Sequence, residues 1–180
     1  MITVGIDPDT KTSAIALMED GQLKEVKIIK GNGLQAQVKG LGEFLGEGGF
    51  EYHRYKHYVI ESQQIYAGGT KNPGSILKLA HVAGGLLGVV SESGWLDRFS
   101  FPTPREWKGS VPKQIHQARI LSRLGWEYKK SGTVKAGYCY PVGTVFKEAK
   151  QNIEGAQGLK RTDWKHLVDA IGLAMWGEKQ

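Results

Sequence analysis

The first thirty residues alternate between apolar runs and short polar turns, a pattern typical of β-strands joined by hairpins. The apolar runs cover residues 2–6, 13–18 and 23–29. Asp7-Pro8-Asp9-Thr10 has turn chemistry, because Pro fixes φ and Asp side chains accept hydrogen bonds from nearby backbone amides. Glu19-Asp20-Gly21 is a hairpin signal. This region predicts three consecutive antiparallel strands.

Helical periodicity then alternates with further short strands. Leu34, Val38, Leu41 and Leu45 recur at helical spacing, and a glycine-rich stretch at 46–49 ends this helix. Tyr58-Val59-Ile60 predicts a fourth strand that ends at Glu61, and residues 98–102 are compatible with a fifth.

Residues 75–92 predict the most apolar helix of the chain. One stripe, suited to packing on a sheet, consists of Ile76, Leu79, Ala83, Leu86 and Val90. Further apolar residues surround a row of small ones at Ala80, Gly84 and Gly88. A helix that is apolar nearly all round is usually buried all round. We therefore expect its second face to meet the same helix of a second copy across a two-fold axis.

The second half of the chain predicts three more helical segments and one irregular stretch. Thr103-Pro104-Arg105-Glu106 forms a capping box with proline at the first helical position. A basic helix over 113–124 follows, and its expected inward residues are Ile115, Ala118, Leu121 and Leu124. Residues 126–160 show no periodicity, which is typical of a functional loop, a small hairpin excursion or a mobile segment. The last helix is expected over 163–176.

The resulting order is β-β-β-α-β-α-β-α-loop-α. An antiparallel start followed by strands alternating with helices predicts an α/β fold with a mixed five-stranded sheet and helices on both faces. We expect a single domain over 1–180, with a basic loop or insertion at about 129–160.

Composition excludes several classes of protein. Hydrophobic residues make up 40% and charged residues 23% of the 180 residues, which is typical of a globular protein. No uninterrupted apolar run approaches the ~18 residues of a membrane span, and the N-terminus has no basic signal-peptide region. The lone Cys139 offers neither an internal disulfide nor a zinc framework. We expect a cytoplasmic protein without a membrane partner.

Charge is distributed unevenly along the chain. The net charge is +6, but residues 98–165 hold 14 Lys/Arg against 5 Asp/Glu, whereas residues 1–97 hold 9 against 11. A basic second half indicates a surface for polyanions, although a solvated basic face would give the same pattern.

Acidic residues lie at the ends of predicted elements. Asp7 closes the first strand, Glu61 closes the fourth, and Asp169 lies in the last helix near His166. If the first and fourth strands are neighbours, a helix crossing their edge could bring all four side chains into one cleft. Such a carboxylate cluster needs cations, and oxygen ligands with one imidazole suit Mg²⁺ or Mn²⁺.

Four segments resemble the RuvC family of Holliday-junction resolvases, within the RNase H-like nucleases. They are Val4-Gly5-Ile6-Asp7-Pro8-Asp9-Thr10, Val59-Ile60-Glu61-Ser62-Gln63, Asn72-Pro73-Gly74-Ser75-Ile76-Leu77-Lys78-Leu79 and His166-Leu167-Val168-Asp169-Ala170. Order and spacing agree over roughly 1–128 and 160–177. The chain departs from the family pattern in a longer segment after Glu61 and in the 129–160 insertion, departures compatible with a phage-encoded member.

The resemblance implies an RNase H-like fold and a structure-selective endonuclease that resolves four-way (Holliday) DNA junctions. It implies that Asp7, Glu61, His166 and Asp169 are the catalytic and metal-binding residues, and that a homodimer nicks two strands symmetrically. Two Mg²⁺ ions ~3.5–4 Å apart, or Mn²⁺ in their place, would activate a water and stabilise the leaving 3′ oxygen. Asp7 would bridge the ions, Glu61 and Asp169 would hold one each, and His166 would bind metal or orient the water.

Basic residues and one aromatic residue are the candidates for DNA contact. Those expected to follow phosphates are Lys108, Lys113, Arg119, Arg123, Lys129 and Lys130. Tyr66 with Lys71 could insert at the junction, because stacking of an aromatic ring on an opened base contributes ~1–3 kcal/mol. Trp107 and Trp126 are expected in core or boundary packing instead.

Other functions remain compatible with the sequence. An RNase H-like enzyme could act on other branched DNA or on RNA–DNA hybrid, and a catalytically silent protein could bind DNA structures. Actin-like sugar kinases and ATPases share the motif of the first hairpin, but they need two such domains and 180 residues supply one.

Overall fold

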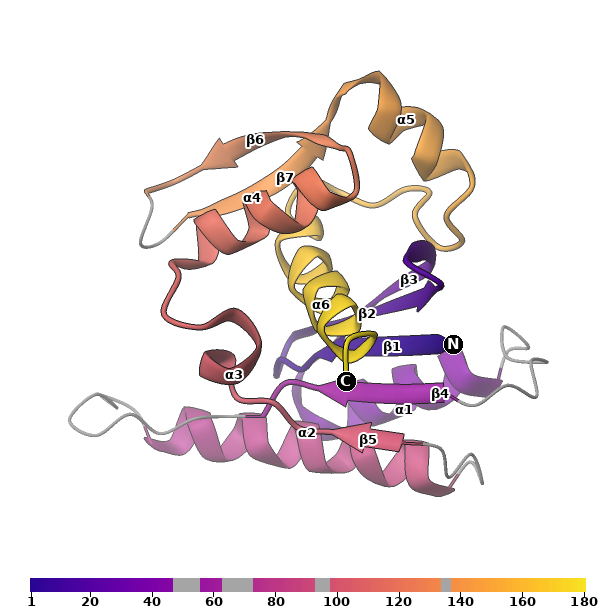
Figure 1. The fold of residues 1–180 in the computed structure, drawn as a ribbon. Helices are drawn as coiled ribbons and strands as arrows, with labels where there is room; N and C mark the ends of the chain where they lie inside the picture. Colours follow the sequence, from indigo (N-terminus) through magenta and orange to yellow (C-terminus); the bar gives the residue numbers. More distant parts are fainter. Residues whose placement is uncertain (47–55, 63–72, 93–97, 134–136) are drawn as a thin grey trace.

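A computed structural model describes residues 1–46, 56–62, 73–92, 98–133 and 137–180. Its main sheet has the order β3-β2-β1-β4-β5 (Figure 1). The antiparallel part contains β1 (Ile2–Asp7), β2 (Thr12–Glu19) and β3 (Gln22–Lys30). The strands β4 (Lys56–Ile60) and β5 (Arg98–Ser100) continue in parallel from β1. The mixed five-stranded sheet predicted from the sequence is confirmed.

Helices cover both faces of this sheet, as the apolar periodicity predicted. The helices α1 (Gly33–Gly46) and α2 (Pro73–Glu92) lie on one face, and α6 (Trp164–Gly177) lies on the other (Figure 1). Two separate hydrophobic clusters result. One includes Val4, Ile6, Leu41 and Leu86 under α1 and α2, and the other surrounds α6. The central strand β1 is buried on both faces, which explains its continuous apolar run.

The described elements between β5 and α6 form a layer above α6, except the first short helix, which lies beside the main sheet (Figure 1). The helices α3 (Pro104–Lys108) and α4 (Lys113–Arg123) come first, and the capping box predicted at Thr103 and Glu106 is present. A two-stranded antiparallel sheet of β6 (Glu127–Ser131) and β7 (Tyr138–Val142) follows, then α5 (Gly143–Gln151) (Figure 1). Of the alternatives expected for 126–160, the hairpin excursion is the one found.

The end of this excursion is tied back to the main sheet. The Val26 N–H donates to the Glu154 carbonyl over 2.9 Å, and the Glu154 N–H donates to the Lys24 carbonyl over 2.9 Å. Gly155 follows with φ +73°, and a Cβ at this position would collide with the Val26 carbonyl. The glycine therefore permits the close contact that places the chain for its return into α6.

The inward face of α4 differs from the prediction. The sequence predicts a buried Ile115, but this side chain is 40% exposed, whereas Gln114 and Gln117 are buried. Each glutamine satisfies its amide through partners far along the chain: Gln114 donates to the Ser131 carbonyl, and Gln117 accepts from the Cys139 N–H. Hydrophobic periodicity cannot reveal an inward face that is polar because of such long-range partners.

The α2 helix leaves much of its apolar surface uncovered. Ala83, Leu86 and Val90 are buried, but Leu77 is 58% exposed. Among the described residues, Pro73–Ser91 is the one span long and apolar enough to cross a membrane by length and composition, and 22% of it is buried. The sequence was expected to contain no apolar run long enough to span a membrane. By length and composition, Pro73–Ser91 meets that requirement.

Candidate active site

Two strand ends bring Asp7 and Glu61 to one edge of the sheet. The parallel strands β1 and β4 pair with Ile6 opposite Ile60. The Glu61 N–H donates to the Ile6 carbonyl over 3.1 Å, so the ladder continues one residue beyond β4. Asp7 and Glu61 are therefore neighbours at the carboxyl ends of adjacent parallel strands, where sites form in α/β sheets.

Gly5 allows α6 to cross directly over β1. The even-numbered residues of β1 pack in the cluster under α1 and α2, so its odd-numbered residues face α6. A Cβ at Gly5 would collide with the Ala170 carbonyl and the Ala174 amide nitrogen. The absence of a side chain at Gly5 thus sets how closely the helix approaches the strand that carries Asp7.

The close approach places two residues of α6 beside Asp7. His166 and Asp169 are three residues apart, so they lie on the same face of the helix. The His166 Nδ1 is 3.3 Å from Asp7 Oδ2, within hydrogen-bond distance when that nitrogen carries the proton. Asp169 is 4% exposed and Asp7 is 8% exposed. The first strand, the fourth strand and the last helix therefore meet at these side chains.

Glu61 is held by the short helix α3. The Trp107 Nε1–H donates to Glu61 Oε1 over 2.9 Å, and the Lys108 ammonium lies 3.4 Å from the same oxygen. Burial raises the pKa of Glu61, as does the charge of Asp7; Lys108 and the Trp107 hydrogen bond lower it, and Asp169 raises it again. The net result is a raised pKa, so the three carboxylates sense one another's charge.

Asp169 is held by α4. Gln117 Nε2 donates to Asp169 Oδ1 over 2.9 Å and to the Lys165 carbonyl over 2.8 Å. The Lys113 ammonium forms an ion pair with Asp169 Oδ2. Burial lowers the pKa of Lys113, but the charges of Asp169, Asp7 and Glu61 outweigh it and raise this pKa above its usual value. Lys113 was predicted to follow DNA phosphates; in the structure its ammonium belongs to the carboxylate cluster.

Three other predicted DNA-contact residues line one cavity beside Glu61. This cavity has a volume of about 240 Å³, and its basic residues are Lys108, Arg119, Arg123 and Lys179, set among Trp107 and Trp176. Burial lowers the pKa of His116, which lines the same cavity, to about 4, so this imidazole is neutral at pH 7. Lys129 and Lys130 are exposed on β6, while Tyr66 and Lys71 lie outside the described residues.

Comparisons with known proteins match this architecture at the level of structure. No protein-family model matches the sequence, and no curated protein sequence matches it. A solved structure of Thermus thermophilus RuvC in complex with a Holliday junction substrate matches with TM-score 0.59 and 14% identity, covering 98% of this chain and 91% of that one. The chain has the RuvC fold. A second Thermus thermophilus RuvC structure gives TM-score 0.51 at 17% identity, covering 98% and 92%.

These two matches span nearly all of this chain and more than nine tenths of each RuvC chain. The yeast mitochondrial Holliday junction resolvase Ydc2 is also similar, with TM-score 0.46 and 15% identity over 98% of this chain and 80% of that one. The two Thermus thermophilus matches confirm, for the fold, the resemblance inferred from sequence motifs. That the chain is encoded by a phage stays a prediction.

The donor set of this RuvC-fold site suits a hard divalent cation. Three carboxylates and one imidazole are ligand types that Mg²⁺ and Mn²⁺ accept, and a cation would relieve the repulsion that raises the pKa of Glu61. Among the described residues, no three His, Cys, Asp or Glu side chains already converge as a metal cage. The three carboxylates and the imidazole fit such a cation by chemistry and charge. In this structure the positive charge beside Asp169 is that of Lys113.

Sequence reasoning missed three residues that support the site. The sequence assigns Trp107 to packing, and it is buried, but its indole N–H also orients Glu61. Gln117 and Lys113 orient Asp169 from another helix. A polar residue such as Gln117 at an inward position of an amphipathic helix was the available signal. Two further acidic residues have structural roles: Asp9 accepts from the Lys11 N–H in the turn, and Asp163 is at the start of α6.

Proposed function

We propose that the chain is a metal-dependent endonuclease that resolves four-way DNA junctions through paired nicks by a homodimer. The observation that carries this proposal is that three carboxylates lie at one sheet edge: Asp7 and Glu61 follow adjacent parallel strands, and the charge of Asp169 acts on Glu61. His166 Nδ1 lies 3.3 Å from Asp7 Oδ2, and Lys108 of the basic cavity contacts Glu61. The likeness in fold to a RuvC structure that holds a Holliday junction substrate supports the choice of substrate.

The roles of the residues follow from their contacts. Divalent cations bound by the carboxylates would lower the pKa of a water molecule and stabilise the charge of the leaving oxygen. Trp107 and Lys108 keep Glu61 oriented, and Gln117 does the same for Asp169. The His166 Nδ1 faces Asp7, so Nε2 would be the nitrogen available to hold a cation or to orient water. Two cations, Mg²⁺ with Mn²⁺ as a substitute, are part of the proposal.

Substrate DNA would approach over the basic cavity. Lys108, Arg119 and Arg123 present positive charge beside Glu61, and such contacts supply salt-dependent affinity for phosphates. Lys113 is paired with Asp169, and we infer that its ammonium would also contact the scissile phosphate once cations bind the carboxylates. Lys129 and Lys130 on the exposed face of β6 extend the basic surface.

The dimer rests on the uncovered face of α2. Ala80, Gly84 and Gly88 form an exposed row, and a Cβ added at either glycine meets nothing within 4 Å. The neighbouring Gly85 behaves differently: a Cβ there would collide with Leu34 and Val38 of α1. The chain's own packing therefore uses Gly85 and leaves the row of small residues free for a second copy. An apolar, self-complementary helix face suits an isologous contact.

Cleavage of defined substrates tests the proposal. A panel of four-way junction, replication fork, RNA–DNA hybrid and linear duplex is incubated with the protein in Mg²⁺. Junction-selective paired nicking supports the proposal. Preference for hybrid or forks would favour another RNase H-like substrate, and binding without cleavage would favour a silent DNA-structure binder.

A further inference from the structure

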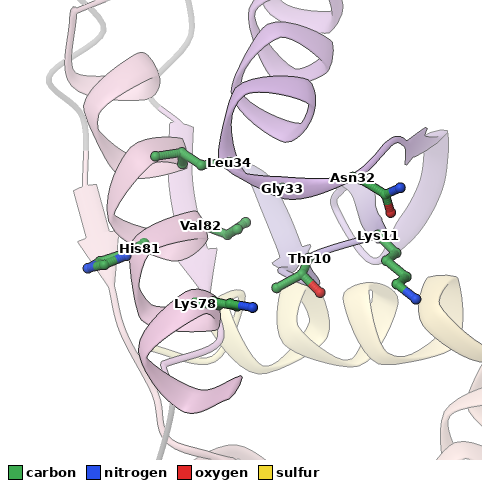
Figure 2. A pocket seen from close by; sticks show the side chains of 8 residues that line it. All are labelled: Thr10, Lys11, Asn32, Gly33, Leu34, Lys78, His81 and Val82. Carbon is green, nitrogen blue, oxygen red and sulfur yellow. The ribbon is translucent and has the colours of Figure 1, made fainter. Parts of the chain in front are cut away.

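A second cavity lies on the other side of the sheet, where three segments meet. The loop after β1 contributes Thr10 and Lys11, the start of α1 contributes Asn32 and Leu34, and α2 contributes Lys78 and Val82 (Figure 2). Its volume is about 340 Å³, at the lower end of the ~300–1,000 Å³ typical of ligand pockets. None of these residues belongs to the carboxylate cluster or to the basic cavity beside Glu61.

The lining of this cavity is positive from several directions. Lys11 and Lys78 come from opposite walls, and Figure 2 shows Lys78 extending from α2 toward the loop that carries Thr10. The described lining residues include no carboxylate. The N-terminal end of α1 also borders the cavity, and the first turn of this 14-residue helix contains no acidic residue. A helix N-terminus adds partial positive charge, so the cavity favours an anion.

The shape and the neutral lining residues indicate which anion. Thr10 and Asn32 offer hydrogen bonds beside the lysines, whereas Leu34 and Val82 provide an apolar wall. A free inorganic ion would make no favourable contact with an apolar wall. A sugar–phosphate unit of a nucleic acid strand combines one charged group with a largely apolar ring, which can contact such a wall. The lining thus matches a backbone segment of DNA.

The cavity walls are fixed to each other and to the catalytic strand. The Gly33 N–H donates to the Thr10 carbonyl over 2.8 Å, and the Gly31 N–H donates to the Lys11 carbonyl over 3.1 Å. The buried Gln37 connects the same parts, because it donates to the Gly31 carbonyl and accepts from the Ser13 N–H. The start of α1 is therefore held against the loop that follows Asp7, which fixes two of the three walls of the cavity to each other.

The distance to the carboxylate cluster is short. Thr10 follows Asp7 by three residues, so their Cα atoms lie at most about 11 Å apart. Successive charges along one DNA strand are separated by ~3.4 Å of helix axis. The wall of the cavity formed by Thr10 therefore lies within the length of a few nucleotides of Asp7.

We propose that the cavity lined by Thr10, Lys11, Asn32 and Lys78 binds a sugar–phosphate unit of the DNA strand that is cut, a few nucleotides from the cleavage point, and so positions the scissile phosphate. This inference rests on the proposed nuclease function and adds a substrate-positioning site to it. It assigns Lys11 and Lys78 to DNA contact, which the sequence did not suggest.

The first test is a nuclear magnetic resonance titration of the full chain in EDTA. A tetrathymidylate oligonucleotide and inorganic phosphate are added separately, and the amide signals of Thr10, Lys11, Asn32 and Gly33 are followed. The oligonucleotide is expected to shift these signals at lower concentration than phosphate, and Lys11→Gln/Lys78→Gln is expected to abolish the shifts. No shift with the oligonucleotide overturns the proposal. Equal response to both ligands also overturns it, because the cavity is then a free-anion site only.

The second test measures junction affinity against salt concentration, again in EDTA. Loss of one phosphate contact reduces the magnitude of the slope of log affinity against log salt by ~0.9, and the double variant should show a reduction of about that size. The control Lys24→Gln, at the exposed start of β3, should leave the slope unchanged. An unchanged slope in the double variant contradicts the proposal. Both tests are independent of cleavage. A chain that binds DNA in this cavity but cuts no junction contradicts only the proposed nuclease function. A chain that cuts junctions but binds no DNA in this cavity contradicts only this inference.

Discussion

The Lys113 ammonium and the Asp169 carboxylate form an ion pair inside the carboxylate cluster. The positive charge of Lys113 interacts with Asp169, Asp7 and Glu61, and these interactions raise the pKa of Lys113. The same helix supplies Gln117 to the other oxygen of Asp169. Because α4 follows a basic stretch, Lys113 reads in the sequence as one of several phosphate-binding lysines, yet its partners are acidic residues of its own chain.

Replacement of Lys113 by Gln should make the thermal stability of the protein depend more strongly on added Mg²⁺. Lys113 is 38% exposed, so the loss of its pair should cost about 1 kcal/mol in the free energy of unfolding, the upper end for partly screened pairs. Thermal unfolding in EDTA and in Mg²⁺ measures this. Mg²⁺ should raise the Tm of Lys113→Gln more than that of the wild type. Lys39→Gln, which removes an exposed pair with Glu43, is the control and should leave both values unchanged. An equal Mg²⁺ effect in Lys113→Gln and wild type contradicts the account.

Replacement of Glu61 by Gln should stabilise the metal-free protein near pH 8 while it removes cleavage. Burial and the charge of Asp7 raise the pKa of Glu61, so its ionised form is disfavoured in the folded state. The stabilising contribution of the neutral form is present below the unfolded pKa near 4.5 and is lost as pH rises through the raised folded pKa. A glutamine side chain does not titrate, so the Glu61→Gln variant keeps this contribution at pH 8.

The measurement for Glu61 is Tm against pH in EDTA, with Glu43→Gln as an exposed control. The Tm difference between Glu61→Gln and wild type should grow from pH 4 to pH 8. A variant that is less stable than wild type at pH 8 would mean that the contacts with Trp107 and Lys108 outweigh burial and repulsion, and the electrostatic description of the site would be wrong.

The antiparallel start of the sheet, the order of strands and helices, and the positions of Asp7, Glu61 and Asp169 could all be predicted from the sequence. They depend on local signals: apolar runs of strand length, a turn after Asp7, and a charge within an apolar helix. Gly5 was part of a recognised motif, but its physical role appears only when α6 lies over it.

The supporting contacts could not be predicted, because each joins residues far apart in the chain. Gln117 is separated from Asp169 by 52 residues, and Trp107 from Glu61 by 46. The exposed Ile115 beside buried glutamines reverses the simple rule for an amphipathic helix, since those glutamines are buried with their hydrogen-bond partners. Polar inward positions are where the periodicity of a sequence carries least information about packing.

Gly84→Leu should separate the proposed dimer into folded monomers. A Cβ added at Gly84 meets nothing within 4 Å among the described residues, so the fold should persist. A leucine side chain at this position would push apart two helices packed along the row of small residues. Light scattering at micromolar concentration measures the mass. Gly42→Leu is the matched control, since this glycine of α1 also has open space around its Cβ and lies outside α2.

A wild type that is monomeric with and without junction DNA contradicts the dimer. Flotation with lipid vesicles distinguishes the remaining occupant of the apolar α2 face: binding to vesicles by the monomeric wild type would assign that face to a membrane. Paired nicking should be lost in Gly84→Leu and kept in Gly42→Leu.

The most direct test of the nuclease assignment compares two neighbouring aspartates on a four-way junction in Mg²⁺. Asp7→Asn removes a charge from the carboxylate cluster and should lower the cleavage rate by ~10²–10³-fold, the scale of losing one main stabiliser of transition-state charge. Asp9→Asn keeps an oxygen for the Lys11 N–H in the turn and should cleave near the wild-type rate. Both variants should still bind the junction. Cleavage by Asp7→Asn at the wild-type rate, or equal loss in both variants, would contradict the assignment of the active site.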